Sequence, residues 1–581
     1  MNWWWLCMPR LPWSEPSKPP PFYGVNTKIP LSVAMVMGFQ HALAMIGGII
    51  AVPLLLTGPY NARLTSAETE YLISAGLLSS GILSLISVTR FKVFNTGYFL
   101  GTGLISVLGT SFTFVPIAQA AMKFMMDSDS GIGQEAYGAF LGTAVFCAFL
   151  EIALSFLPKD QLRRCFPPII TGTCVMLIGF GLTGEGFKYW GGGTDVQMSF
   201  QFCQDNGQVK LPFGSPQYVT LGFAVFLSLI MIEVFGSPFL RNCEVAIALL
   251  FGFFISAVAT YNNDGTKEWF VVNDKISSAP GITFLWVKTF PLTVYPPAIL
   301  PCLICYIITT VETIGDITAS AEASKLATVG DDFDSRIQGG VLADGFCAMM
   351  ACLFTTPPNT TFAQNNGVIA LTRCANRRAG YCCCFFLILF GIIAKVAAVI
   401  ATIPDCVLGG MTTFLFVNIV VSGVNILGPA IAVRRNRFIV CASLAVGIGV
   451  ALAPQWATNA LVAPGKTATA QLASDSLVIV LSTPYCIGTI TALLLHLLIP
   501  NDKEDETNVV RNDDMVKEKA SELSFAHFIP TDSSVYQGSD HTMASQQGMN
   551  APVVGEQQVY PVRHPHNFTV LVVFLTLTPV I

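Results

Sequence analysis

Long apolar runs separated by short polar connections make up most of this chain of 581 residues. Most of the runs approach the roughly 20 residues that a helix needs to cross a lipid bilayer. The runs occupy residues 29–56, 70–89, 98–122, 136–157, 165–183, 217–235, 243–261, 291–315, 337–355, 361–374, 380–401, 407–426, 437–453 and 474–499. We therefore expect an all-α polytopic membrane protein with 14 transmembrane segments, preceded by a cytosolic lead at residues 1–28.

The tenth run is unusual because polar residues interrupt it. It follows a proline pair and carries the amides Gln364, Asn365 and Asn366 directly before Gly367. Apolar segments interrupted by Pro or Gly are typical of broken helices, whose free backbone groups can bind a substrate at membrane depth. The alternative is a polar loop that joins two helices, which the return to apolar residues at 368–371 disfavours.

A stretch of similar sequence lies at the start of the third run. Residues 95–105 align without gaps on residues 359–369, with Asn, Thr, Gly and Ile identical in register. Pro167 and Pro404 give a fainter second match, since each is followed by a glycine at the same spacing. Matching interrupted segments in two halves indicate a transporter built from repeats. We expect segments 3 and 10 to be broken half-helices with short extended stretches.

Charges in the connections test this arrangement. Basic residues such as Arg90, Arg163 and Arg434 fall on every second connection, as the positive-inside rule requires if the N-terminus is cytosolic. Two halves of seven segments each must then point in opposite directions, which is an inverted repeat. Residues 500–581 form a tail of different composition, which we expect to be cytosolic and mostly disordered.

Composition narrows the class of protein. Hydrophobic residues make up 52% of the chain and charged residues 12%, whereas soluble domains carry about a quarter charged residues. Most of the 17 cysteines lie inside apolar runs as small hydrophobes, so we expect no metal site and no cofactor. The six histidines are scattered and supply no catalytic cluster, which disfavours an enzyme. The net charge of −5 says little about partners, and we expect none among nucleic acids.

Three carboxylic acids lie in or next to the eighth and ninth runs. Glu312 and Asp316 are four residues apart, so on a helix they share one face, and Asp344 has apolar neighbours in the next segment. Intramembrane carboxyl groups normally face the bundle interior and are frequent members of proton relays. The alternative, in which each group only caps or anchors a neighbouring helix, stays open and is strongest for Asp316.

Other polar residues inside the runs carry less information. His41 lies in the middle of the first segment, and for a lone intramembrane histidine we favour a structural hydrogen bond over a ligand role. Glu151 and Glu233 lie near the cytosolic ends of their segments, where a long side chain can reach the membrane surface. We expect both side chains only to reach the membrane surface, without a role in the site.

These segments together offer the parts of a binding site. They supply a carboxamide (Gln364), a carboxylate (Glu312), two aromatic rings (Phe112 and Phe362) and the N-termini of two half-helices. Helix N-termini present free N–H groups, and aromatic faces stack on planar rings. An amide beside a carboxylate can form paired hydrogen bonds. A planar heterocycle therefore fits better than a sugar or an inorganic ion.

Three motifs resemble those of the nucleobase–ascorbate transporter family. They are the stretch 364–373 (QNNGVIALTR), the pair Gln40-His41 and the stretch 312–316 (ETIGD). The similarity runs from about residue 21 to residue 500, and it is most marked with the fungal uric acid–xanthine permeases. The resemblance implies proton symport of purines, most of all uric acid and xanthine, at the plasma membrane, with both termini cytosolic.

The resemblance also implies an architecture. A mobile core domain would comprise residues 29–157 and 291–401, and a gate domain would comprise residues 165–261 and 407–499. The gate domain would supply a homodimer interface, and the core would carry substrate by an elevator-type movement against it within the lipid. The alternative is a transporter of uracil, ascorbate or an inorganic anion on the same fold.

Roles for single residues follow from the same resemblance. Glu312 and Gln364 would form hydrogen bonds with the purine, and Phe112 and Ala363 would line the pocket. Proton coupling and support of the site would rest on Asp344, Asp316, His41, Asn365, Gly367, Thr372 and Arg373. One departure from relatives lies in the last segment, where Pro484-Tyr485 stands in place of a frequent Gly-Phe pair.

Overall fold

The computed structural model describes most of the chain up to residue 500. The described residues are 7–8, 21–58, 61–94, 96–128, 133–157, 167–192, 202–205, 208–263, 266–271, 276–277, 279–328, 330–428, 430–453, 456 and 468–500. Residues 1–517 form one compact unit, and the residues of a second unit, 518–581, all lie outside the described part. The predictions for the tail and for most of the N-terminal lead therefore also lie outside it.

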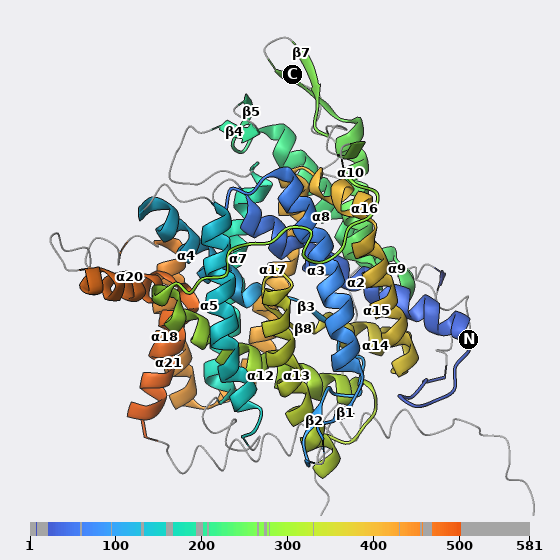
Figure 1. Ribbon diagram of the computed structural model, residues 1–581, viewed down its shortest axis with the longest axis vertical. Coiled ribbons are helices and arrows are strands. Elements are labelled where there is room, and N and C mark those ends of the chain that lie inside the picture. The colour runs from blue at the N-terminus through green and yellow to red at the C-terminus, as the bar shows by residue number, and fades with distance from the viewer. Residues whose placement is uncertain are drawn as a thin grey trace, which may run out of the picture. The chain divides into compact units, whose positions relative to one another are not determined.

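Helices dominate the described residues (Figure 1). In chain order they are α2 (Leu31–Thr57), α3 (Ser66–Val88), α4 (Val115–Ser128), α5 (Gly133–Leu154), α7 (Pro168–Trp190), α8 (Pro216–Phe235), α9 (Pro238–Asn242), α10 (Glu244–Val258), α12 (Ile299–Ala323), α13 (Asp331–Leu353), α14 (Gln364–Thr372), α15 (Arg377–Ile392), α16 (Ala394–Ala401), α17 (Asp405–Leu427), α18 (Arg434–Leu452), α20 (Ala468–Ser482) and α21 (Pro484–Leu498). Local chemistry explains several starts: Thr65 and Glu68 form a capping box before α3, and proline opens α7, α8 and α21.

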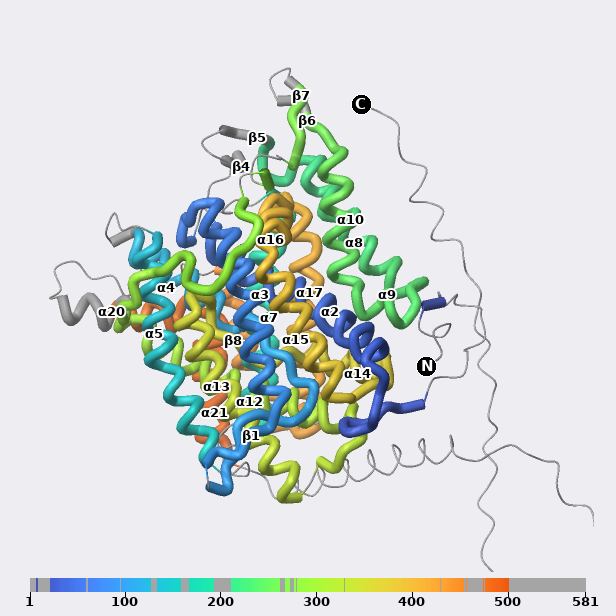
Figure 2. The backbone as a smooth tube through the Cα atoms, turned by 45° about the vertical axis from the view of Figure 1, so that its right-hand side comes forward, coloured from blue at the N-terminus to red at the C-terminus, as the bar shows by residue number. Residues whose placement is uncertain are grey.

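Short strands pair two by two between these helices. The pairs are β1 (Phe91–Lys92) with β2 (Phe99–Leu100), β3 (Leu108–Thr110) with β8 (Asn359–Thr361), β4 (Phe202–Asp205) with β5 (Gln208–Pro212), and β6 (Thr260–Asn263) with β7 (Thr266–Trp269). The β4–β5 and β6–β7 hairpins lie at one end of the helices and the β1–β2 pair lies at the opposite end (Figure 1, Figure 2). The β3–β8 pair lies between the helices.

Eight of the described helices are long and apolar enough to cross a membrane, and the number is ten if each of two bent pairs is one span. One bent pair is α15 with α16, which are inclined by 75°. Helices α4 and α10, in the third and seventh apolar runs, have 14 and 15 residues. At ~1.5 Å per residue they are shorter than the ~30 Å hydrocarbon core. The polytopic, mostly helical class is therefore observed, while the count of 14 stays a prediction.

The β3–β8 ribbon joins the third and tenth apolar runs. Leu108 pairs with Thr361 and Thr110 with Asn359, in antiparallel register. Residues 95–105 all precede β3, so their alignment on residues 359–369 does not match one strand of the ribbon with the other. Residues 99–100 of that stretch form β2 instead. Short matches of Asn, Thr and Gly reflect turn chemistry that any polar interruption shares.

The second sequence match marks two helices that pack together. Pro167 and Pro404 are the N-caps of α7 and α17, which run antiparallel. A Cβ on Gly172, near the start of α7, would lie 3.1 Å from the backbone near the end of α17. A Cβ on Gly409, near the start of α17, would lie 2.0 Å from the backbone nitrogen of Trp190. Glycine at these positions lets the two backbones approach closely.

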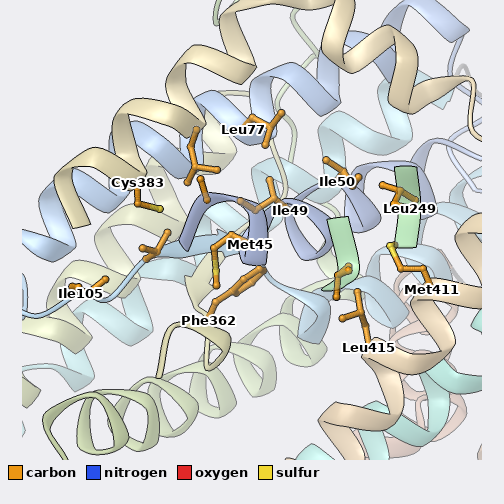
Figure 3. Close-up of a cluster of buried hydrophobic side chains, with 14 of the residues drawn as sticks. Met45, Ile49, Ile50, Leu77, Ile105, Leu249, Phe362, Cys383, Met411 and Leu415 are labelled. Atoms are coloured by element: carbon orange, nitrogen blue, oxygen red, sulfur yellow. The ribbon is translucent and has the colours of Figure 1, made fainter. Parts of the chain in front are cut away.

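Helix α2 runs through the largest hydrophobic cluster. Met45 of α2 lies against Phe362, the residue after β8, and α2 also contacts Leu77 of α3 (Figure 3). Towards the other side of α2 the cluster continues to Leu249 of α10 and Met411 of α17 (Figure 3). The cluster thus fixes the strand ribbon against helices from both halves of the chain.

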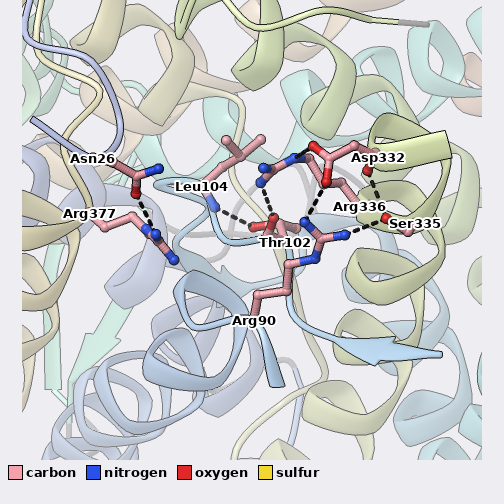
Figure 4. Close-up of polar contacts among 8 residues, drawn as sticks. All are labelled: Asn26, Arg90, Thr102, Leu104, Asp332, Ser335, Arg336 and Arg377. Carbon is pink, nitrogen blue, oxygen red and sulfur yellow. Dashed lines mark hydrogen bonds and ion pairs between the residues drawn. The ribbon is translucent and has the colours of Figure 1, made fainter. Parts of the chain in front are cut away.

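Charged side chains fix the β1–β2 segment to the start of α13 (Figure 4). Arg90 donates to Asp332 at 2.8 Å and to the hydroxyl of Ser335, and Arg336 donates to Asp332 and to the carbonyl of Thr102, both at 2.9 Å. The hydrogen bond from Arg90 holds the pKa of Asp332 below its usual range. This network positions the chain that leads into β3.

Candidate functional site

Helix α14 begins directly after β8 and has an uncovered face. Ala363 is its N-cap and Gln364 its first residue, and both are exposed, as is Gly367 one turn later. A Cβ added at Gly367, or at Gly315 on the neighbouring helix α12, would meet no atom within 4 Å. The backbone N–H groups of Asn365 and Asn366 already donate to the carbonyls of Phe362 and Ala363, at 3.2 Å and 3.0 Å. The start of α14 therefore presents its positive dipole end beside an accessible amide.

Two carboxyl groups of α12 contact the two ends of the strand ribbon. Glu312 Oε2 accepts a hydrogen bond from Thr113 Oγ1 at 3.3 Å, in the 3₁₀ turn η1 (Phe112–Phe114) after β3. Asp316 Oδ2 accepts one from Thr361 Oγ1 at 2.9 Å, at the end of β8. Thr361 Oγ1 is also 3.2 Å from Thr313 Oγ1. Glu312 and Asp316 are both half-buried, and both face the ribbon as their spacing predicts.

Asp344 of α13 is completely buried and accepts a hydrogen bond from Thr360 Oγ1 at 3.1 Å. Glu151 of α5 is also 0% exposed and lies beside Asp344. The expectation that Glu151 reaches the membrane surface is therefore wrong. Its carboxyl oxygens instead lie 3.3 Å from the hydroxyls of Thr309 and Thr310 on α12, because α5 packs with this face against α12 and α13.

His41 joins α2 to α14. Its Nδ1 lies 3.1 Å from Oδ1 of Asn365, and the Asn365 amide nitrogen donates to the carbonyls of Val107 at 3.3 Å and Phe362 at 3.1 Å. Both side chains are buried. The hydrogen bond expected for His41 is therefore present, and Asn365 braces the ribbon from inside.

The two aromatic candidates lie in different surroundings. Phe112 is half-buried and makes an edge contact with Phe416 of α17, with ring centroids 5.4 Å apart. Phe362 is 7% exposed, and Cβ atoms at Gly48 or Gly109 would each lie 2.6 Å from its ring. Phe112 thus contacts α17 from the turn after β3, a turn that also packs on α12. Phe362 belongs to the hydrophobic core and is not exposed beside Gln364.

Tyr485 of α21 also contacts the turn after β3. Its hydroxyl donates to the carbonyl of Thr113 at 3.2 Å and lies 3.3 Å from Sγ of Cys305. A phenylalanine at this position could not make these contacts. The side chain of Thr113 donates to Glu312, so Thr113 links the Tyr485 hydroxyl to the carboxylate of the candidate site.

Thr372 and Arg373 lie at the far end of α14. Thr372 Oγ1 donates to the carbonyl of Val368 at 2.6 Å within the helix. Arg373 ends the helix in the left-handed conformation, at φ 57°, and its carbonyl accepts from the backbone of Tyr23 at 2.9 Å. Eight residues of helix, or about 12 Å, separate Thr372 from Gln364. These two residues hold the end of α14 rather than its exposed start.

The geometry places Glu312 beside the turn that carries Phe112, and Asp316 beside the end of β8, from which the chain continues through Ala363 to Gln364. Sequence reasoning missed Glu151, Thr113 and the threonines of β8. The threonine run at 360–361 next to the amides was a usable signal, because hydroxyls on a strand can bond carboxyl groups of a facing helix. No such signal existed for Glu151. Among the described residues, no cluster of His, Cys, Asp or Glu suits a metal ion.

Known proteins are similar to this chain over most of its length. Residues 32–456 match the Permease family. The uric acid-xanthine permease of Emericella nidulans is 43% identical over 515 residues, which cover 86% of this chain and 87% of the relative. A putative purine permease of Schizosaccharomyces pombe is 42% identical over 522 residues, covering 86% and 85%. The xanthine permease XanP of Escherichia coli is 30% identical over 494 residues, covering 83% and 95%.

Among solved structures, the transmembrane domain of a cyanobacterium bicarbonate transporter, BicA, has a similar fold. The TM-score is 0.50 at 12% identity, and the match covers 72% of this chain and 96% of that domain. The likeness concerns the fold alone. The sequence relatives confirm the resemblance that the motifs at 364–373 and 312–316 predicted. The chain belongs to the Permease family and is a multi-pass membrane transporter rather than an enzyme.

Proposed function

We propose that the protein is a proton-coupled symporter that imports purines, with uric acid and xanthine as its substrates. The observation that carries this proposal is the exposed side chain of Gln364 at the start of α14, which follows the ribbon strand β8, while Glu312 contacts Thr113 in the turn after the partner strand β3. The printed names of the relatives, a uric acid-xanthine permease and a xanthine permease among them, support purines as the substrate class.

The chemistry of these groups suits an oxidised purine. Such a ring has neighbouring N–H donors and carbonyl acceptors in one plane. The Glu312 carboxylate accepts from ring N–H groups, the Gln364 carboxamide both donates and accepts, and the positive dipole end of α14 favours carbonyl oxygens. Phe112 supplies an aromatic edge or face to the ring, and Ala363 leaves room for it. The coupling ion in this proposal is the proton, and no cofactor takes part.

Helix packing supports a division into core and gate. Helices α2, α3 and α15 pack together, as do α5, α12 and α13, and these would form the core. Helix α7 packs against α17, α18 and α21, and α8 packs against α10 and α17, which would form the gate. Contacts such as that of Phe112 with Phe416 lie between the two groups. In this proposal the core moves along the gate and carries the purine across the membrane.

The remaining parts of the proposal concern the membrane and assembly. The protein would span the plasma membrane 14 times as an inverted repeat of seven and seven segments, with both termini in the cytosol. Large apolar side chains of α8, such as Phe223 and Met231, are exposed, which supports contact with lipid or with a second subunit. The gate would supply the homodimer interface.

Uptake of labelled xanthine tests the proposal. Cells without purine permeases of their own would express the wild type, Glu312→Gln, Gln364→Ala and the control Glu233→Gln. The side chain of Glu233 is 62% exposed beside Arg241. We expect wild-type uptake to collapse with a protonophore and both site variants to lose uptake while they remain at the cell surface. Normal uptake by Gln364→Ala would refute the site. No xanthine uptake by surface-resident wild type would redirect the substrate to uracil, ascorbate or an inorganic anion.

A further inference from the structure

Two buried carboxyl groups face each other between α5 and α13. Glu151 on α5 and Asp344 on α13 are each 0% exposed, and their carboxyl groups are in hydrogen-bond contact. Helices α5 and α13 pack closely here, since a Cβ at Gly345 would lie 2.9 Å from Cγ of Glu151. Two ionised carboxylates in contact in a dry interior are costly unless something compensates them. At least one of the pair must therefore carry a proton.

The surroundings of Glu151 do not suit a carboxylate. Its two oxygens lie 3.3 Å from the hydroxyls of Thr309 and Thr310. Each hydroxyl has only one proton, and the carbonyl of Tyr306 is a nearer acceptor for both, at 3.1 Å and 2.7 Å. Once the threonines donate to this carbonyl, they offer Glu151 lone pairs and no proton. A neutral carboxylic acid fits these surroundings, whereas an ionised one would be left without donors.

Asp344 has the opposite surroundings. Thr360 Oγ1 donates to its Oδ2 at 3.1 Å, and the hydroxyl of Thr313 and the backbone N–H of Thr361 also approach the carboxyl group. Its other oxygen, Oδ1, is buried and receives no hydrogen bond from any donor of the described residues except a proton on Glu151. The site therefore provides donors to one oxygen of Asp344 and leaves the other, Oδ1, to accept a hydrogen bond from Glu151.

No opposite charge compensates the pair within the described part of the chain, where no ion pair joins Lys or Arg to either carboxyl group. The other titratable groups that face it are acids or neutral at physiological pH. On α12 they are Tyr306, Glu312 and Asp316, and on α13 there is Cys347. Negative neighbours favour keeping the proton on the group that has the fewest donors.

We propose that Glu151 is a permanently protonated carboxylic acid that donates its O–H to Asp344 Oδ1 and so stabilises the Asp344 carboxylate. A carboxylic acid kept neutral by an apolar site is an effective hydrogen-bond donor to an anion. Asp344 then binds and releases the coupling proton, while Glu151 keeps its own. Glu151 is a positioning residue, because it touches neither the purine nor the transported proton. The inference rests on the proposed proton symport.

The variants that test this role differ in the donor they keep. Glu151→Gln is neutral and retains an N–H donor to Asp344, so its uptake should stay within about threefold of the wild type. Glu151→Leu removes the donor, and accumulation should fall by about tenfold or more. Because a carboxylate without its donor holds a proton more tightly, the pH profile of Glu151→Leu should also move to higher pH. Glu233→Gln is the matched control on an exposed glutamate.

Infrared spectroscopy of the purified protein gives a readout that does not depend on transport. We expect the C=O stretch of a protonated buried carboxyl group at every pH from 5 to 9 in the wild type, and its loss at pH 9 in Glu151→Gln. This readout also keeps the test valid if Glu151→Leu does not fold. If the wild type carried no purine, the proposed function would fail while the infrared result still decided the protonation of Glu151.

Three results would overturn the inference. The first is loss of proton-dependent accumulation in surface-resident Glu151→Gln, which would make Glu151 itself the group that exchanges protons. The second is a folded Glu151→Leu with wild-type uptake and an unchanged pH profile. The third is a wild-type spectrum without the protonated carboxyl band at pH 9, where Asp344 is ionised in the proposal, or the same band at pH 9 in Glu151→Gln.

Discussion

His41 and Asn365 are hydrogen bonded at 3.1 Å although 324 positions separate them in the chain. The side chain of Asn365 also donates to the carbonyl of Val107, just before β3, and to that of Phe362, just after β8. Gln364, its neighbour at the start of α14, is exposed. The buried amide of Asn365 thus fixes the start of α14, including the exposed Gln364, relative to α2.

Loss of this hydrogen bond should destabilise the protein. His41→Ala leaves the buried Oδ1 of Asn365 without a donor, which costs about 1–3 kcal/mol. His41→Asn should retain most of the stability, because its amide nitrogen can take the place of Nδ1. Thermal unfolding of the purified protein in detergent measures both variants. Equal unfolding temperatures for His41→Ala and the wild type would contradict the structural role of His41.

Gly367 and Gly109 should respond differently to larger side chains. A Cβ at Gly367 meets nothing within 4 Å, so Gly367→Leu should leave stability within about 0.5 kcal/mol of the wild type and still block uptake by covering the start of α14. A Cβ at Gly109 meets the ring of Phe362 at 2.6 Å, so Gly109→Ala should cost about 1–3 kcal/mol. Uptake and unfolding temperature, measured together, separate the two effects. Wild-type uptake by Gly367→Leu would show that this face does not carry substrate.

Tyr485→Phe tests the contact between α21 and the turn after β3. The variant removes the hydroxyl that donates to the Thr113 carbonyl at 3.2 Å, an interaction worth about 1 kcal/mol. If the proposed core moves along the gate, this bond breaks during transport, and its loss should raise the transport rate up to about fivefold. Rates of xanthine uptake at saturating substrate provide the measurement. A rate that falls, at equal surface expression, would mean that the hydroxyl supports the site instead.

The Arg90–Asp332 ion pair should contribute stability that depends on pH. The Arg90 hydrogen bond lowers the pKa of Asp332 from its ordinary value of 3.8, so its contribution is complete at neutral pH and is lost as the pH falls below about 4. The side chain of Asp332 is 69% exposed, so the effect should be small and screened by salt. Unfolding temperatures of Asp332→Asn and of the control Asp331→Asn, from the same first turn of α13, measure it at two salt concentrations. A loss in Asp332→Asn that salt leaves unchanged would exclude an ion-pair effect.

Local patterns in the sequence determined where the helices and the helix break lie in this protein. Apolar runs near the length of a membrane span predicted where helices occur, because a helix in lipid must satisfy its backbone internally and cover it with apolar side chains. The spacing of Glu312 and Asp316 placed both on the helix face that meets the ribbon. The proline and amides around Gln364 predicted a break, and the break is observed as β8 followed by α14.

Only the tertiary structure decided which side chains meet. Helix α5 is apolar on all sides, so its sequence does not show which face lies inside, and Glu151 could equally have reached the membrane surface. The register of β3 with β8 depends on how two distant segments pack, which short matches of Asn, Thr and Gly cannot determine. Phe362 belongs to the core for the same reason, since Gly48 and Gly109 leave a space for its ring that only the packed structure reveals. Contacts between distant segments depend on the complementary shapes of two surfaces, and no single stretch of sequence contains both.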